Sequence, residues 1–170
     1  MNLFCLQNFI NNLKVFNMNI FVVDENPKIA AQMLCDKHVN KMLLESCQIM
    51  ATVLNKHSIK TTYKPTHQNH PCTLWAGKSK QNFEWLKSHA LALAQEYTHR
   101  YKKIHKCEQY IHNEYECPET IESIGLTQFA QAMPDEYKDV DPIKAYRKYY
   151  IGAKKEFARW TNRSIPSWFN

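Results

Sequence analysis

The sequence predicts an all-α fold: a single compact domain of three main helices, with a short extended segment at its start and an acidic loop insert. Only 3 of the 170 residues are glycine, whereas β-sandwiches and α/β folds that cradle nucleotides use glycine in many turns. No proline or glycine interrupts the chain between Pro27 and about Asn55. The hydrophobic content of 44% is typical of one globular domain of this length.

The first elements are an extended segment and a long helix. Residues 19–23 form a β-branched run that turn-forming residues close at 24–27, which predicts a strand or an extended lead-in. Pro27 then begins a helix that continues to about Asn55. At about 100° per residue, one face of this helix carries an apolar stripe that we expect in the core. The stripe consists of Ile29, Met33, Leu43, Cys47, Met50 and Leu54.

A polar loop over 56–73 precedes the second helix, which Thr73 caps and which extends from Leu74 to about Lys103. Its apolar face contains Trp85, Leu86, Leu93 and Tyr97, and its exposed face contains Lys87, Gln95, Glu96 and Arg100. Residues 104–126 are acidic and predict an irregular loop, followed by a short helix over 127–132. Asp141 and Pro142 form an N-cap and N1 pair that opens the third helix, which ends near Trp160. The aromatic tail over 164–169 is expected to dock on the core.

The charge distribution indicates a polyanionic partner on one side of the molecule. Residues 1–106 contain 14 Lys/Arg and 6 Asp/Glu, residues 107–139 contain 1 and 8, and residues 140–170 contain 7 and 2. Two basic segments around an acidic insert suit nucleic-acid binding. A basic protein with a solvated acidic loop would show the same pattern.

Several classes of protein are not indicated. The six cysteines have no regular spacing, so we expect reduced thiols in an intracellular protein. Residues 1–17 mix apolar residues with five asparagines, which fits neither a signal peptide nor a membrane span. No glycine-rich phosphate loop is present, and the His67-x-x-His70-x-Cys72 loop lacks a second ligand pair for zinc. We therefore expect neither a metal ion nor another cofactor.

The polar face of the first helix is the strongest candidate for catalysis. His38, Lys41 and Glu45 follow at i, i+3 and i+7, with Asp36 and Lys37 beside them. An imidazole, an amine and a carboxylate within two turns are the groups that acid–base or Schiff-base chemistry requires. The alternative is a solvated face with a Lys/Glu pair that contributes only about 0.3–0.5 kcal/mol.

Candidate binding residues lie in the polar loop and on the later helices. The loop offers hydrogen-bond donors to a phosphate or a base, although it could equally satisfy its own polar groups. Basic residues interleaved with aromatic ones near the third helix suit phosphate contact and base stacking, while about half of those aromatic side chains are expected in the core. The full candidate set is Lys64, Thr66, His67, Asn69, His70, Trp75, Arg100, Arg147 and Lys154.

Five stretches of the chain resemble a family of small proteins from tailed phages and large DNA viruses. They are Met18–Asp24, Cys35–Met42, Lys64–Cys72, Gln131–Tyr137 and Ala145–Tyr150. The resemblance covers residues 18–170. It implies a single helical domain over that range, an extension over 1–17 that lies upstream of the family start at Met18, and an intracellular location in an infected host cell.

The order of elements is also similar to that of the phage pyrimidine-dimer DNA glycosylases of the endonuclease V type. In that class the N-terminal α-amine attacks the sugar C1′ to form an imine, and a carboxylate on the first helix assists. The resemblance implies that Glu45 is this carboxylate, that His38 and Lys41 replace basic residues of the first helix, and that the partner is duplex DNA, including damaged DNA. Lys37 or Lys41 could supply the amine instead.

Two other functions remain open from the residues. One is a non-catalytic viral module that binds nucleic acid or a host protein on the same basic surface. The other is an enzyme for a nucleotide or a small phosphorylated molecule, in which His38, His67 and His70 converge in a pocket.

Overall fold

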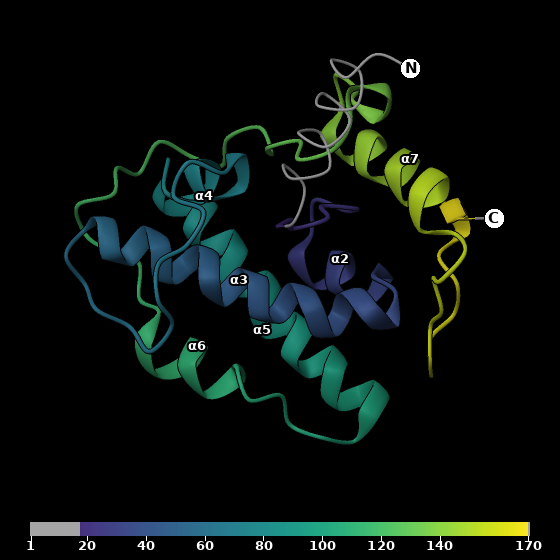
Figure 1. Ribbon diagram of the computed structural model, residues 1–170, viewed down its shortest axis with the longest axis horizontal. Coiled ribbons are helices and arrows are strands. Elements are labelled where there is room, and N and C mark those ends of the chain that lie inside the picture. Colours follow the sequence, from purple (N-terminus) through teal and green to yellow (C-terminus); the bar gives the residue numbers. More distant parts are fainter. Residues whose placement is uncertain (1–17, 170) are drawn as a thin grey trace, which may run out of the picture.

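Two long helices, α3 (Asp36–Lys56) and α5 (Lys80–Tyr101), form the centre of the fold and pack against each other (Figure 1). The computed structural model describes residues 18–169, and within this range it contains helices and no strand, as the sequence predicts. The shorter helices surround the central pair: α2 (Pro27–Met33), α4 (Pro71–Ala76), α6 (Glu108–Glu114), η1 (Asp135–Tyr137), α7 (Pro142–Lys154) and η2 (Ser167–Phe169). The expected extension over 1–17 lies outside the described residues.

The predicted first helix is divided into α2 and α3, so its expected continuity from Pro27 to Asn55 is wrong. Leu34 and Cys35 adopt extended backbone and are fully buried. Groups distant in sequence satisfy the freed backbone donors: Cys35 N donates to Tyr150 Oη at 3.0 Å, and Asp36 N donates to the Arg159 carbonyl at 2.8 Å. The core stripe is confirmed at Leu43, Cys47, Met50 and Leu54, whereas Met33 is half-buried and Ile29 is exposed.

The second predicted helix is also divided, into α4 and α5. His70, not Thr73, caps α4, because its Nδ1 accepts from Cys72 N and Pro71 follows at the first helical position. Ser79 caps α5 by accepting from Asn82 N. The short helix expected over 127–132 is absent, because Thr127 forms hydrogen bonds with the Asn82 side chain through both its N–H and its hydroxyl.

The chain after α5 differs from the prediction at two places and agrees at two. Residues expected to be an irregular loop include α6, and α7 ends at Lys154 rather than near Trp160. Asp141 does cap α7, with its carboxylate accepting from Ile143 N at 2.9 Å. The aromatic tail docks on the core as expected, since Phe169 is buried and contacts Trp160.

A buried ion cluster joins four parts of the chain. The Arg100 side chain has no exposed surface and contacts Glu96 Oε1 at 2.7 Å, Asp36 Oδ1 at 2.9 Å and the Gln32 carbonyl at 3.0 Å. Glu96 also accepts hydrogen bonds from Nε and Nη2 of Arg163, and these partners together hold the pKa of Glu96 below its ordinary value against the opposing effect of burial. The prediction that Glu96 and Arg100 are exposed is therefore wrong. Each supplies the counter-charge that allows the other to be buried.

We expect Arg100→Met to lower the free energy of unfolding by about 3–5 kcal/mol, because it leaves buried carboxylates with incomplete compensation. Urea denaturation followed by circular dichroism measures this change. The matched control is Lys80→Met, which breaks the half-exposed pair between Lys80 and Glu84 and should change stability by no more than about 0.5 kcal/mol. Equal effects of the two substitutions would show that the cluster is not a principal stabilising element.

Candidate functional site

The carboxylate of Glu45 and the backbone nitrogen of Asn19 meet beneath the surface of α3. Asn19 N donates to Glu45 Oε2 at 2.8 Å, and Lys41 Nζ lies 3.2 Å from Glu45 Oε1. Glu45 and Asn19 are both buried, whereas 60% of the Lys41 side chain is exposed. One carboxylate thus bridges a backbone nitrogen from the start of the described chain and an amine at the surface.

The extended segment that contains Asn19 is fixed by its own side chain and by an aromatic cluster. Asn19 Nδ2 donates to the Ala132 carbonyl at 2.7 Å, and Oδ1 accepts from the N–H groups of Ile20 and Phe21. Phe21 has φ +56°, a left-handed conformation that is unfavourable for a bulky residue. Its ring stacks on His38 with centroids 4.2 Å apart, so packing holds this conformation in place.

Opposing effects act on the proton affinity of Glu45. Burial raises the pKa of the carboxyl above its ordinary value, while the Asn19 hydrogen bond, Lys41 and His67 act to lower it. The net direction is upward. A carboxyl with a raised pKa holds its proton more strongly than an exposed glutamate does, which is a common property of groups that transfer protons in active sites.

His38 is buried beside this site and is neutral. Burial, followed by the positive charges of Lys154 and Lys41, lowers its pKa to about 3. The Tyr150 hydroxyl oxygen accepts from Cys35 N at 3.0 Å and lies 2.6 Å from His38 Nδ1, within hydrogen-bond distance. The ring of His38 contacts Phe21, Tyr150 and Phe157.

The polar loop before α4 is attached to α3 and approaches Glu45. Thr52 Oγ1 donates to the Thr66 carbonyl and accepts from Thr66 N, both at 2.9 Å. Lys56 Nζ donates to the Gln68 carbonyl farther along the loop. His67 is exposed, has φ +51°, and is close enough for its charge to lower the pKa of Glu45.

Basic side chains from α3 and α7 surround the aromatic cluster. Lys154 Nζ lies 4.5 Å from the Tyr149 ring centroid and 5.8 Å from that of Phe21. Lys37 Nζ lies 4.9 Å from the centroid of Phe157. These cation–π contacts keep two positive charges on the same side as the Phe21 ring.

A family model described as pyrimidine dimer DNA glycosylase matches residues 18–109. The chain belongs to this family. No curated protein and no solved structure matches the chain. The matched range includes the two groups that meet at 2.8 Å, Asn19 and Glu45, and ends before α7. DNA is the substrate that membership of the glycosylase family implies.

The structure brings together some of the candidate residues that the sequence indicates. Glu45, Lys41 and His67 lie at one site, with His38 packed behind them. The rings of His67 and His70 contact each other at 6.4 Å between centroids, while His70 is buried and caps α4. The ring contacts of His38 are with Phe21, Tyr150 and Phe157, so among the described residues its ring does not pack against His67 or His70 as in the alternative of a three-histidine pocket. Lys64 and Asn69 are exposed on the loop, and Thr66 is half-buried.

The side chains of four candidate site residues form hydrogen bonds or ion pairs with other parts of the protein. Arg100 is buried in the ion cluster, where Asp36 also accepts from the Thr161 hydroxyl and N–H. Trp75 packs on Trp85 and Phe129 and donates to the Thr127 carbonyl. Arg100 and Trp75 are buried and do not present a surface to DNA, which corrects the prediction for these two, whereas the Asp36 side chain is partly exposed. Arg147 donates to the Val23 carbonyl and lies 3.5 Å from Asp24, so it anchors the extended segment while remaining partly exposed.

Asn19 and Phe21 are site residues that the sequence analysis did not identify. Spacing along a helix relates Glu45 to Lys41, but no local pattern relates either to a segment 26 residues earlier. The only available signal was the family resemblance, which implies an amine near this end of the domain. Within residues 18–169, no group of three His, Cys, Asp or Glu side chains could hold a metal ion, and no helix is long and apolar enough to cross a membrane.

We expect the imidazole of His38 to remain neutral at pH 5. Its folded-state pKa lies below the ordinary value, so its contribution to stability is present above pH 6.5 and is lost as the pH falls towards 3. Nitrogen-15 NMR of the ring measures the protonation state. Lys154→Ala should raise the pKa of His38, whereas Lys144→Ala, at an exposed position of α7, should not. A positively charged ring at pH 5 would contradict the assignment.

Proposed function

We propose that the protein is a DNA glycosylase and abasic-site lyase that acts on duplex DNA containing a pyrimidine dimer. The observation that carries the proposal is the 2.8 Å contact between Asn19 N and the buried carboxylate of Glu45. Family membership supplies the substrate class, and the geometry supplies a nitrogen and a carboxylate within reach of one reacting atom.

The proposed nucleophile is the α-amine that Asn19 acquires when it is the first residue of the chain. The amine lone pair forms a bond to C1′ as the bond from C1′ to the pyrimidine breaks, and the base leaves with that electron pair and takes up a proton. The amine then loses its remaining excess proton, and the sugar ring opens at O4′, which is protonated, to give an imine. Reversible protonation by Glu45 is suited to these transfers.

The lyase step uses the same groups. Removal of a proton from C2′ by the Glu45 carboxylate allows the 3′ phosphate to leave with the electron pair of its C–O bond. The imine draws electron density from C1′ and makes the C2′ proton acidic. Hydrolysis of the imine by water then releases the unsaturated sugar and restores the amine.

The surface around the site supports binding of a polyanion. Lys37, Lys41 and Lys64 are exposed, and Lys154 is partly exposed above the aromatic cluster. The carboxylate that pairs with Lys41, Glu45, is buried beneath the surface. Phosphates that approach α3 therefore meet positive charge, which favours DNA binding and makes it dependent on salt.

Lys41 is the competing amine, because its Nζ lies 3.2 Å from the other oxygen of Glu45. Its side chain is exposed and forms an ion pair with Glu45, whereas Asn19 N lies buried beside the same carboxylate. The structure thus offers two nitrogens on one carboxylate, and the location of a trapped adduct distinguishes them.

The decisive experiment traps the imine. Two fusion proteins are prepared from which removal of the carrier leaves either Asn19 or Met18 as the first residue, and circular dichroism verifies that both products fold like the full chain. Each is incubated with a labelled duplex that contains an abasic site or a thymine dimer, in the presence of borohydride. We expect a covalent adduct at the Asn19 amine, and less adduct from the chain that begins at Met18. Adduct at Lys41 would replace Asn19 as the nucleophile, and absence of adduct and strand cleavage on both duplexes would refute the proposal.

Glu45→Gln should lower the rate of strand cleavage by at least about 100-fold, which is the lower range for a lost acid–base group. Binding to the duplex should change little, because the substitution removes no positive charge from the surface. Glu84→Gln on the exposed face of α5 is the matched control and should retain full activity. Equal losses of binding and cleavage in Glu45→Gln would indicate a structural role and favour a non-catalytic DNA-binding module.

A further inference from the structure

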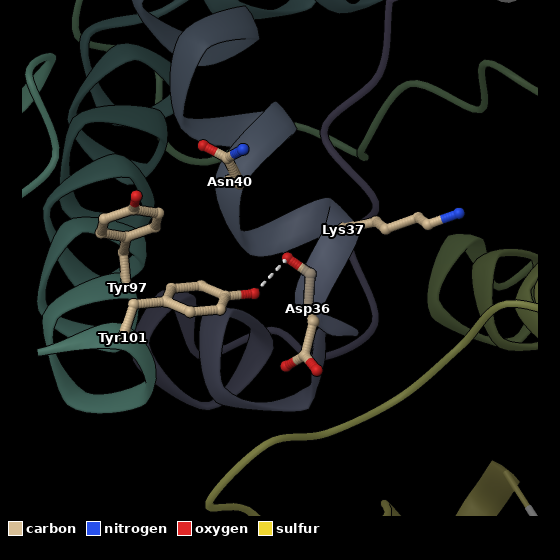
Figure 2. A pocket seen from close by; sticks show the side chains of 5 residues that line it. All are labelled: Asp36, Lys37, Asn40, Tyr97 and Tyr101. Atoms are coloured by element: carbon tan, nitrogen blue, oxygen red, sulfur yellow. Dashed lines mark hydrogen bonds between the residues drawn. The ribbon is translucent and has the colours of Figure 1, made fainter. Parts of the chain in front are cut away.

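A second concave site lies between α3 and α5, on another side of α3 from Glu45. Figure 2 shows this pocket, which has a volume of about 280 Å³ and is lined by Asp36, Lys37, Asn40, Tyr97 and Tyr101. This volume is close to the lower limit for small-molecule sites, so it suits one planar ring rather than a larger ligand.

Two aromatic rings line the pocket, and a third ring supports them from behind. The rings of Tyr97 and Tyr101 project from one face of α5, with centroids 4.8 Å apart. His105 places its ring edge-to-face against Tyr97, also with centroids 4.8 Å apart, and its Nε2 is 3.0 Å from Asn40 Oδ1. The Tyr101 hydroxyl donates to the Asp36 carbonyl at 3.2 Å (Figure 2). These contacts connect the walls to both helices, so the pocket is preformed.

The pocket has little negative charge of its own. Figure 2 shows the Asp36 carboxylate directed away from the two tyrosines. That carboxylate is held by Arg100 at 2.9 Å and by Thr161. Lys37 also points away from the tyrosines and lies over Phe157 instead (Figure 2). The side-chain amide nitrogen of Asn40, Nδ2, forms no hydrogen bond within residues 18–169.

A basic loop follows the helix that supplies the tyrosines. Lys102, Lys103 and Lys106 are all exposed and form no ion pair within residues 18–169. The backbone of this loop is held in position: Lys102 adopts a left-handed conformation, its N–H donates to the Thr98 carbonyl, and the Thr98 hydroxyl donates to the Lys103 carbonyl at 3.1 Å. His105, in the same loop, connects these lysines to the pocket wall.

We propose that this pocket binds an unpaired nucleotide of DNA, with its base against Tyr97 and Tyr101 and its neighbouring phosphates on the 102–106 loop. Aromatic side chains beside a positive surface are the usual combination for single-stranded nucleic acid. A paired base is covered on both faces by its neighbours, so only an unpaired or extruded base can offer its ring to the tyrosines. An acidic peptide would form ion pairs with the lysines, but its carboxylates would not stack on the tyrosine rings.

The position of the pocket relative to Glu45 links it to the proposed function, on which this inference rests for its assignment to DNA. Asn40 precedes Glu45 by five residues on α3, which is about 7.5 Å along the helix axis. The pocket thus lies on the same helix as the carboxylate but on another face, and we assign it to a nucleotide other than the one that reacts.

The test uses the full chain and a thymidine pentanucleotide with 2-aminopurine at its centre. We expect binding to quench the fluorescence of the 2-aminopurine through stacking on a tyrosine. Tyr97→Leu should weaken binding roughly tenfold, and Tyr97→Phe, which keeps the ring, should restore it. Lys103→Ala should reduce the salt dependence of binding by about 0.7 in the log–log slope. Tyr110→Leu and Lys78→Ala alter half-buried and exposed positions away from the pocket and serve as matched controls.

Each outcome separates this inference from the proposed catalysis. Quenching that depends on Tyr97 supports the pocket even if no borohydride adduct forms on an abasic duplex, because the pentanucleotide contains no lesion. An adduct with the duplex, together with unchanged pentanucleotide binding in Tyr97→Leu, would overturn the pocket and leave the catalysis intact. Equal losses in Tyr97→Leu and Tyr110→Leu would overturn it, as would competition by poly-glutamate with the same dependence on Tyr97.

Discussion

The buried guanidinium of Arg100 is the constraint on which the arrangement of the helices depends. A charge with no exposed surface requires compensation on every side, and here the partners come from α3, α5 and the carbonyl of Gln32 in α2. Arg163 adds the C-terminal segment through Glu96. Because Asp36 occupies the first turn of α3, this cluster fixes the rotation of that helix about its axis. The same rotation determines which side chains of α3 face the extended segment and which face α5.

Short sequence patterns predicted the helices whose capping groups lie close by in the sequence. Asp141 and Pro142 begin a helix because the cap is formed with residues two and three positions later. The interruption at Leu34 and Cys35 was not predictable in this way, since the donors released there are satisfied by Tyr150 and Arg159, more than a hundred residues away. The candidate site also combines contacts that sequence spacing predicts with contacts that it does not. Helical spacing relates Lys41 to Glu45, but the burial of Glu45 depends on Asn19, which only the tertiary fold brings near.

Three faces of helix α3 contact different parts of the protein. The face with Lys41 and Glu45 meets the extended segment, the face with His38 packs into the aromatic cluster, and the face with Asn40 borders the tyrosines of α5. Burial keeps His38 uncharged, so the positive charge near Glu45 comes from Lys41 and His67, whose side chains are exposed. Such charges can follow a phosphate backbone, whereas the groups assigned to proton transfer are held by packing.

The strained backbone at Phe21 shows why the contact between Asn19 and Glu45 is held so firmly. A left-handed conformation at such a residue costs about 1–3 kcal/mol, and it persists because the ring is confined by His38, Tyr149 and Tyr150. Before this strained residue, one side-chain oxygen of Asn19 accepts from two successive N–H groups, and the nitrogen of Asn19 itself is directed at Glu45. The aromatic cluster therefore maintains the orientation of a nitrogen that it does not contact.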